Sequence, residues 1–340
     1  MTDNAIIKIN KLDFMWPTSD PFLFCVHHED FYPPGNADFG PKSSLKGRTM
    51  GQDFTIKDGW RMYHGDKVPG FPAHPHRGFE TITVVRKGTI DHADSMGAAG
   101  RYGSGDTQWM TAGKGVQHSE MFPLLNQDQE NPAELFQIWL NLPASNKMVE
   151  PHFTMFWKDK TPKVHLKDKA GKTIDIEIIA GAIDNISALS PPPDSWASNH
   201  NNKVAVWVIK MEAGASWTLP AEERGLNRSL YFYQGSSITI SASDLIPMTS
   251  VDLKSDIAVP IINGTEDSYI LLLQGQPIGE PVAQQGPFVM NTSQELEQAY
   301  RDYQTTQFGG WPWPDSGQVH PPTRGRFAKY TDGHEELPEE

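Results

Sequence analysis

Residues 81–95 read TITVVRKGTIDHADS, and this stretch decides the fold class. Its first half is rich in β-branched residues, Lys87 and Gly88 interrupt it, and a second run follows at once. Two such runs around a glycine-containing turn predict a strand, a turn and a second strand. The apolar residues show no helical spacing, so the stretch favours antiparallel β structure.

The same rhythm continues toward the middle of the chain. Residues 100–122 carry five glycines, and LFQIWLNLP at 135–143 predicts a further strand that Pro143 ends. Strands at this spacing are typical of a sandwich or barrel of antiparallel strands. We therefore expect an all-β fold.

A second β-rich block begins near residue 163. The turn at 169–172 separates two predicted strands, and further strand-and-turn patterns follow at 203–220, 228–241 and 267–275. The two blocks are similar in size and rhythm, which indicates an internal duplication.

One helix is predicted, over residues 292–304. Thr292 and Glu295 form a capping box at its start. Its apolar stripe, at helical spacing, consists of Leu296, Ala299, Tyr300 and Tyr303. We expect the helix to pack on a barrel, and Trp311 and Trp313 to dock the Gly- and Pro-rich tail that follows.

The chain has 340 residues, enough for two domains, and a formal net charge of −13. Direct nucleic-acid binding is not expected, because phosphate contact requires concentrated Lys and Arg, and no basic cluster occurs. No apolar run is long enough to span a bilayer, and the N-terminus does not resemble a signal peptide. These features predict a cytoplasmic protein without a membrane partner. Cys25 is the single cysteine, and we expect it to be a buried, inert thiol.

The motif HPHRGFE at 74–80 contains a pair of candidate metal ligands. His74 and His76 are two apart, so in an extended segment both side chains point to the same face. A similar pair, His118 and Glu120, follows in VQHSEMF at 116–122. If the two segments cross within one barrel, three imidazoles and a carboxylate converge on one metal ion. Glu80 is even-numbered, like His74 and His76, so in one continuous strand it would share their face. It therefore competes with Glu120 as the fourth ligand.

The two motifs resemble those of the cupin superfamily, and specifically those of the pirin family. The resemblance rests on HPHRGFE, the following Gly88, and QWMTAGKGVQHSE at 108–120. Gly113 stands where the general cupin pattern has proline, which matches pirins. The resemblance extends to FVMNTSQELEQAYRDYQTTQFGGWPWP near the end, which is similar to longer pirin-like proteins.

This resemblance implies two tandem cupin-type β-barrels, a bicupin, with a C-terminal helix and extended tail. It places a metal-binding cupin domain at 1–150, a cupin domain without metal ligands at 151–290, and the helix and tail at 291–340. It assigns the metal ligands as His74, His76, His118 and Glu120. Glu80 then becomes a supporting or structural group.

The second block lacks candidate ligands. Its corresponding stretch, LPAEERGLNRSLYFYQG at 219–235, contains no histidine. Asn227, Ser229 and Tyr231 occupy the strand positions that could have carried ligands, so a second metal is not expected. This domain would stabilise the first or bind a partner.

The ligand set fits Fe(II), Mn, Ni, Cu or Zn, and the resemblance favours Fe(II). It implies a quercetin 2,3-dioxygenase-like enzyme, whose substrates are dioxygen and a flavonol-like aromatic molecule. Glu120 would act as the catalytic base that takes the substrate hydroxyl proton. Trp109, Met110 and Phe136 are candidate walls of the substrate pocket, although each also fits an ordinary barrel core.

The resemblance also implies an alternative from another class. Pirins are associated with transcriptional coregulation, in which the oxidation state of the iron alters a protein surface without turnover. The same four ligands serve both functions. The acidic charge indicates that such a role would act through a protein partner.

Overall fold

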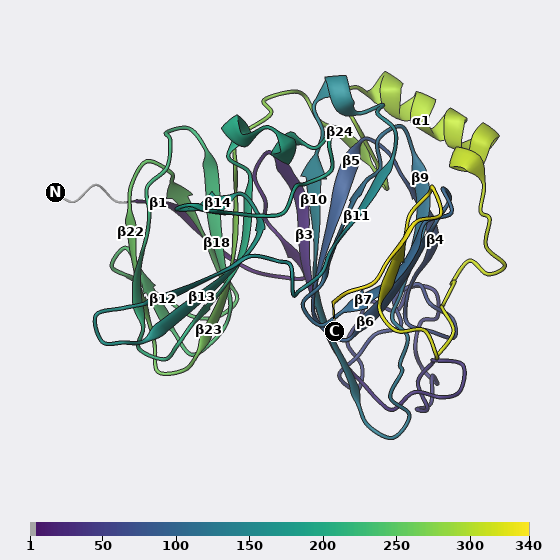
Figure 1. The fold of residues 1–340 in the computed structure, drawn as a ribbon, viewed down its shortest axis with the longest axis horizontal. Helices are drawn as coiled ribbons and strands as arrows, with labels where there is room; N and C mark the ends of the chain where they lie inside the picture. Colours follow the sequence, from purple (N-terminus) through teal and green to yellow (C-terminus); the bar gives the residue numbers. More distant parts are fainter. Residues whose placement is uncertain (1–4, 340) are drawn as a thin grey trace. The chain divides into compact units, whose positions relative to one another are not determined.

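The computed structural model describes residues 5–339, which form an all-β fold with one α-helix (Figure 1). The chain divides into two compact units. One unit combines the described residues up to Cys25 with Lys160–Gly279, and the other combines Val26–Asp159 with the residues from Glu280 onward. Each unit therefore consists of two separate stretches of chain.

The unit that contains the histidine motifs has two antiparallel sheets, with strand orders β11-β8-β5-β10-β3 and β27-β26-β7-β6-β9-β4. Their bounds are β3 (Phe22–Tyr32), β4 (Gly70–His76), β5 (Phe79–Lys87), β6 (Thr89–Asp94), β7 (Ala99–Gly103), β8 (Thr107–Thr111), β9 (Val116–Met121), β10 (Asn131–Asn141), β11 (His152–Phe156), β26 (Phe327–Lys329) and β27 (Glu335–Glu336). A short 3-10 helix, η1 (Ala144–Asn146), follows β10.

The predicted hairpin of the opening stretch is confirmed as β5 and β6, joined at Gly88. Gly88 has a φ of +84°, and a Cβ there would lie 3.0 Å from the backbone oxygen of Pro132. Glycine suits this turn because it adopts a positive φ without strain. The predicted strand at 135–143 is confirmed as part of β10, which pairs antiparallel with β5.

The helix is confirmed as α1 (Ser293–Thr306), with the capping box of Thr292 and Glu295. Its apolar stripe packs with the hairpin of β24 (Ala283–Gln285) and β25 (Phe288–Met290), and a short 3-10 helix η4 (Gln307–Gly309) follows. The buried ammonium of Lys147 fastens β25 to the motif region, since it donates to the backbone oxygens of Gly78 and Val289 and to Asn141 Oδ1.

The segment after η4 contributes a strand that the sequence did not predict. β26 pairs antiparallel with β7, beside which the yellow segment of Figure 1 runs. The buried Arg101 pairs with Asp91 at 2.6 Å and donates to the backbone oxygen of His320. Trp313 donates its indole N–H to the oxygen of Asp94, as the docking hypothesis requires, whereas Trp311 bonds within the segment itself.

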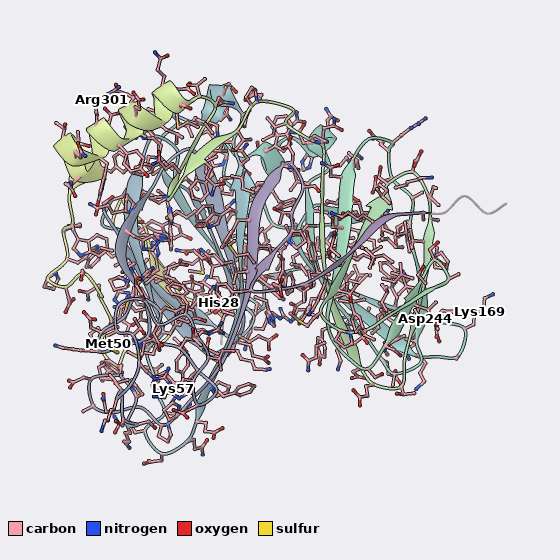
Figure 2. All side chains as sticks on the ribbon, turned by 180° about the vertical axis from the view of Figure 1, so that it is seen from behind. His28, Met50, Lys57, Lys169, Asp244 and Arg301 are labelled. Carbon is pink, nitrogen blue, oxygen red and sulfur yellow. The ribbon has the colours of Figure 1, made fainter. Side chains whose placement is uncertain are left out.

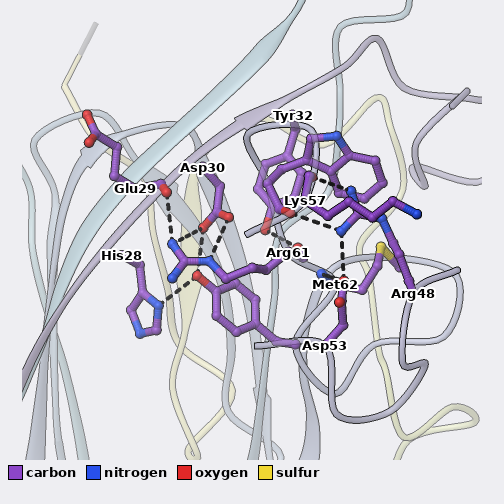
Figure 3. Close-up of polar contacts among 11 residues, drawn as sticks. His28, Glu29, Asp30, Tyr32, Arg48, Asp53, Lys57, Arg61 and Met62 are labelled. Atoms are coloured by element: carbon purple, nitrogen blue, oxygen red, sulfur yellow. Dashed lines mark hydrogen bonds and ion pairs between the residues drawn. The ribbon is translucent and has the colours of Figure 1, made fainter. Parts of the chain in front are cut away.

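A polar network joins the loops at 33–69 to strand β3 (Figure 3). The guanidinium of Arg61 forms an ion pair with Asp30, and the hydroxyl of Tyr63 donates to the same carboxylate at 2.6 Å. Burial lowers the pKa of His28 to about 3, so the neutral ring donates from Nδ1 to the Tyr63 oxygen at 2.8 Å. These buried groups are satisfied by one another, which fixes an otherwise irregular region.

The other unit is built on a sheet of order β1-β21-β18-β23-β16-β13-β12 and a smaller sheet of order β17-β22-β19-β20. The bounds are β1 (Ile6–Lys11), β2 (Met15–Trp16), β12 (Lys163–Lys167), β13 (Thr173–Ala180), β14 (Ala182–Ile183), β15 (Ile186–Ser187), β16 (Ala205–Met211), β17 (Ser216–Leu219), β18 (Asn227–Gln234), β19 (Ile238–Ile240), β20 (Ser243–Leu245), β21 (Thr249–Lys254), β22 (Val259–Asn263) and β23 (Ser268–Gly275). Two 3-10 turns, η2 (Trp196–Ser198) and η3 (His200–Asn202), precede β16.

The turn predicted at 169–172 is confirmed between β12 and β13. In β18, Leu230 and Phe232 face the core of this unit. Asn227, Ser229 and Tyr231 face the opposite side, because side chains alternate along a strand. The three positions that could have carried metal ligands therefore point away from the core of this unit. Tyr231, one of them, donates a hydrogen bond to the backbone oxygen of Pro17.

Among the described residues, no helix combines the length and apolar character that a membrane crossing requires.

Candidate metal centre

Three histidines converge between β4 and β9. The potential ligand atoms of His74, His76 and His118 all lie within 4.8 Å of one another. Their ring centroids are 4.5 to 4.9 Å apart. His76 and His118 are buried, and His74 is half-buried. This arrangement is compact enough for all three imidazoles to reach one ion.

Strand pairing produces this convergence. His74 and His76 lie two apart in β4, so they share one face. β4 pairs antiparallel with β9, and His74 lies directly opposite His118. Side chains of directly opposite residues are neighbours on the sheet. The two motif strands are therefore adjacent, as the spacing of the motifs requires.

The outer nitrogens of two histidines are held by backbone oxygens. His74 Nδ1 lies 2.9 Å from the oxygen of Pro72, and His76 Nδ1 lies 3.4 Å from that of Pro287. If each Nδ1 carries the proton, Nε2 keeps its lone pair for a metal. Burial lowers the pKa of His74 to about 4 and that of His76 well below its ordinary value, so both rings are neutral near pH 7.

His118 provides the test of whether a metal fits. Its side chain is fully buried, and neither ring nitrogen has a hydrogen-bond partner among residues 5–339. Burying a polar group without a partner is costly, and such groups are rare in folded proteins. Burial also lowers the pKa of His118 well below its ordinary value, so the ring offers a lone pair. A metal ion bound by the three histidines would satisfy it, and the residues therefore fit the group.

Glu120 lies beside His118 but outside the compact group that the three histidines form. Its Oε2 is 3.9 Å from His118 Nε2 and accepts from Gln137 Nε2 at 3.2 Å. Oε1 lies 2.9 Å from Thr83 Oγ1, which is also 2.7 Å from Gln137 Oε1. Burial raises the pKa of Glu120, while the bond from Thr83 acts in the opposite direction. The carboxylate is thus held in place beside His118.

Glu80, the competing carboxylate, belongs to a different environment. It is fully buried in β5 and accepts a hydrogen bond from Thr111 Oγ1 at 2.7 Å. Thr83, which bonds Glu120, is three residues further along the same strand. Residues an odd number apart face opposite sides of a strand. Glu80 therefore points away from the face that carries Glu120.

Comparisons with known proteins identify the family. Residues 39–140 match the family model described as Pirin, and residues 206–309 match the model described as the Pirin C-terminal cupin domain. Pirin of Homo sapiens is 33% identical over 255 residues, which cover 73% of this chain and 80% of the human protein. The chain belongs to the pirin family. A pirin-like protein of Caulobacter vibrioides is 36% identical over 243 residues, covering 72% of this pirin-family chain and 82% of its relative.

A solved structure supports the same conclusion about the fold. The crystal structure of a quercetin 2,3-dioxygenase from Acinetobacter baumannii matches with a TM-score of 0.70 and 25% sequence identity. The match covers 90% of this pirin-family chain and 98% of the other protein. The predicted all-β bicupin fold is confirmed.

A further buried histidine, His92, lies near His118 in this pirin-family chain, and the sequence prediction missed it. The His92 ring is 5.7 Å from that of His118 and stacks on Phe153 at 5.1 Å. Its Nε2 lies 3.3 Å from Asp94 Oδ2. His92 and Asp94 are two apart in β6, which is the same spacing signal as in the two recognised motifs. That signal could have identified them.

Two aromatic residues, Phe79 and Trp139, lie next to His76. The His76 ring centroid is 5.0 Å from Phe79 and 5.4 Å from Trp139. The proposed wall residue Phe136 stacks instead on His27, because it is an odd number of residues from Trp139 in β10. The other proposed walls are buried as well: Trp109 lies near Phe156, and Met110 packs with Ala112 and Val116.

Proposed function

We propose that this pirin-family protein is a metal-dependent dioxygenase that opens the ring of a flavonol-type substrate. The observation that carries the proposal is His118, a buried imidazole with two unpartnered nitrogens, set between His74 and His76. The fold match to a quercetin 2,3-dioxygenase supports the choice of substrate class. Dioxygen is the second substrate.

The ligands proposed are His74, His76, His118 and Glu120. Imidazole and carboxylate donors without a thiolate suit Fe(II), which we place first, and also Mn, Ni, Cu or Zn. When bound, such an ion supplies Lewis acidity and, with open positions, a place for dioxygen beside the substrate. Glu120 completes the set from the same strand as His118.

The protein side chains supply proton transfer and orientation. In our proposal Glu120 accepts the proton of the substrate hydroxyl at Oε2, the oxygen nearer to His118. Thr83 and Gln137 hold this carboxylate in position through their hydrogen bonds. Trp139 is half-buried beside His76, so its indole can pack against a flat substrate.

The proposal is tested by loading the protein with Fe(II) without air and then adding quercetin and oxygen. Loss of flavonol absorbance and oxygen uptake should occur together and in proportion. His118→Ala provides the metal-deficient control. If the metal-loaded protein consumes quercetin no faster than this control, the protein is not a dioxygenase for this substrate.

A metal-loaded protein without turnover would favour the redox-sensing coregulator instead. That function predicts that Fe(II) and Fe(III) forms capture different protein partners from a lysate of the source organism. This alternative is excluded if the Fe(II) and Fe(III) forms capture the same partners and neither captures a partner that the metal-free protein does not. The quercetin assay separates the two functions, because a dioxygenase must consume its substrate and a coregulator need not.

A further inference from the structure

The unit without the histidine motifs contains a cavity of about 640 Å³. Its buried wall is formed by residues at the ends of β13, β16 and β23. These are Ala180, Val204, Ala205, Trp207 and Gln274. Its rim is formed by residues 181–203 together with Pro220 and Glu222. The volume lies in the range of pockets that bind small organic molecules.

Trp207 gives this cavity a polar group in need of a partner. Only 2% of the residue is exposed, and its indole Nε1–H has no hydrogen-bond acceptor in the described structure. Buried Trp N–H groups usually have one. Trp207 also lines the cavity, so an acceptor atom of a molecule inside it could accept this bond.

A buried positive charge lies behind the same wall. Arg228, 2% exposed, donates from Nε to Gln274 Oε1 at 2.6 Å and from Nη1 to the oxygen of Pro220 at 2.8 Å. Both acceptors are uncharged, and both residues line the cavity. No carboxylate of the described chain forms an ion pair with Arg228. Burial lowers the pKa of Arg228 to about 10, against the opposing effect of Glu222, so the guanidinium remains charged near pH 7.

The charges on the rim differ in sign. Lys203 and His200 offer positive or neutral groups, while Asp184 and Glu222 offer carboxylates. Lys203 is already 3.6 Å from Glu223, at the surface. The rim therefore favours neither anions nor cations. The buried wall, with an N–H donor and a nearby guanidinium, sets the selectivity for the charge of the ligand.

We propose that this cavity binds a small aromatic carboxylate. Its acidic group accepts from Trp207 Nε1–H on the side of Gln274 and Arg228, and its flat body packs against the apolar wall. This assigns a ligand to the unit without the histidine motifs, and it does not depend on the proposed dioxygenase.

The test uses 2-naphthoate and its uncharged analogue 2-naphthamide as probes, with full-length protein labelled with 5-fluorotryptophan. The ¹⁹F resonance of Trp207 is identified by its loss in Trp207→Phe. Naphthoate should shift this resonance and bind measurably by calorimetry. Trp207→Phe should weaken binding at least about tenfold, since a hydrogen bond to a charged group is lost. Trp217→Phe, which changes another tryptophan of the same unit, should bind as the parent does.

Two further comparisons test the charge and the location. Naphthamide should bind about tenfold more weakly than naphthoate, and Arg228→Met more weakly than Arg228→Lys, with retention of near-UV circular dichroism checked first. His118→Ala should leave naphthoate affinity unchanged, because the metal centre is elsewhere. Equal affinity for both probes, or an unshifted Trp207 resonance on saturation, would overturn the proposal.

Discussion

His76 Nδ1 lies 3.4 Å from the backbone oxygen of Pro287, a residue 211 positions further along the chain. Backbone bonds extend the contact, since Arg77 donates to the oxygen of Pro287 and Val289 donates to that of Arg77. The C-terminal segment thus supplies part of the hydrogen-bond shell around the candidate metal centre. Such outer partners set the orientation of ligands and commonly change metal affinity when removed.

Arg77→Met should loosen this contact and destabilise the protein. The nearly buried guanidinium donates to the oxygen of Lys114 at 2.6 Å, pairs with Asp302 at 2.7 Å and lies over the Phe308 ring. We expect the free energy of unfolding to fall by about 2–4 kcal/mol. Arg301→Met is the control, since Arg301 lies on the outward side of α1 (Figure 2) and should change it by less than about 0.5 kcal/mol. Urea unfolding measures both; equal effects would contradict the anchoring role.

His118→Ala should abolish metal retention. The parent protein, reconstituted with Fe(II) and desalted, should hold about one ion per chain, and the variant at least about tenfold less. His165→Ala is the matched control, because His165 is an exposed histidine of the other unit, paired with Asp175. Metal analysis by mass spectrometry gives the result. Full occupancy in His118→Ala would exclude this residue as a ligand.

Glu120→Gln and Glu80→Gln should have different consequences. Glu120 lies beside His118, whereas Glu80 bonds Thr111 on the opposite face of β5. Glu120→Gln should lower the rate of quercetin loss per bound metal by about 10²–10⁴-fold. Glu80→Gln should mainly lower the melting temperature. If Glu80→Gln instead loses the metal and Glu120→Gln keeps full activity, the assignment of the fourth ligand is wrong.

Acid should remove a stabilising contribution from Glu134. Burial raises its pKa, but hydrogen bonds from His27 and Lys87 outweigh this and lower it from 4.5 to about 2. A folded-state pKa below the unfolded value means that the contribution is complete above about pH 5 and is lost as pH falls toward about 2. It amounts to at most about 3 kcal/mol.

The check for this prediction is Glu134→Gln, which cannot titrate. The stability difference between parent and variant, from urea unfolding, should be largest at about pH 7 and shrink between about pH 5 and pH 2.5. A difference that stays constant over this range would show that the carboxylate is not stabilised by its partners.

The sequence predicted the local parts of this structure well. The hairpin at Gly88, the capping box of Thr292 and the pairing of histidines two apart are all set by short-range patterns with a known period. The confirmed elements follow from those patterns. His92 was missed because the same two-residue spacing of His92 and Asp94 was not weighed beside that of the two motifs.

Long-range pairing set the parts that the sequence did not predict. β26 pairs with β7 across more than two hundred residues, and nothing local distinguishes its three residues from a loop. β1 likewise joins β21 in the other unit. Phe136, a candidate wall of the substrate pocket, stacks on His27 instead. The alternation of side chains along a strand separates two faces, but it does not show which face points toward the pocket.

The pairing of β26 with β7 has a consequence for biosynthesis. β7 ends at Gly103 and β26 begins at Phe327, so a ribosome synthesises β7 long before β26. Until β26 has emerged, the sheet that carries both histidine motifs lacks one of its strands, and the main-chain groups along that edge of β7 have no strand to pair with. We therefore expect this open edge to be a place where the nascent chain can pair wrongly.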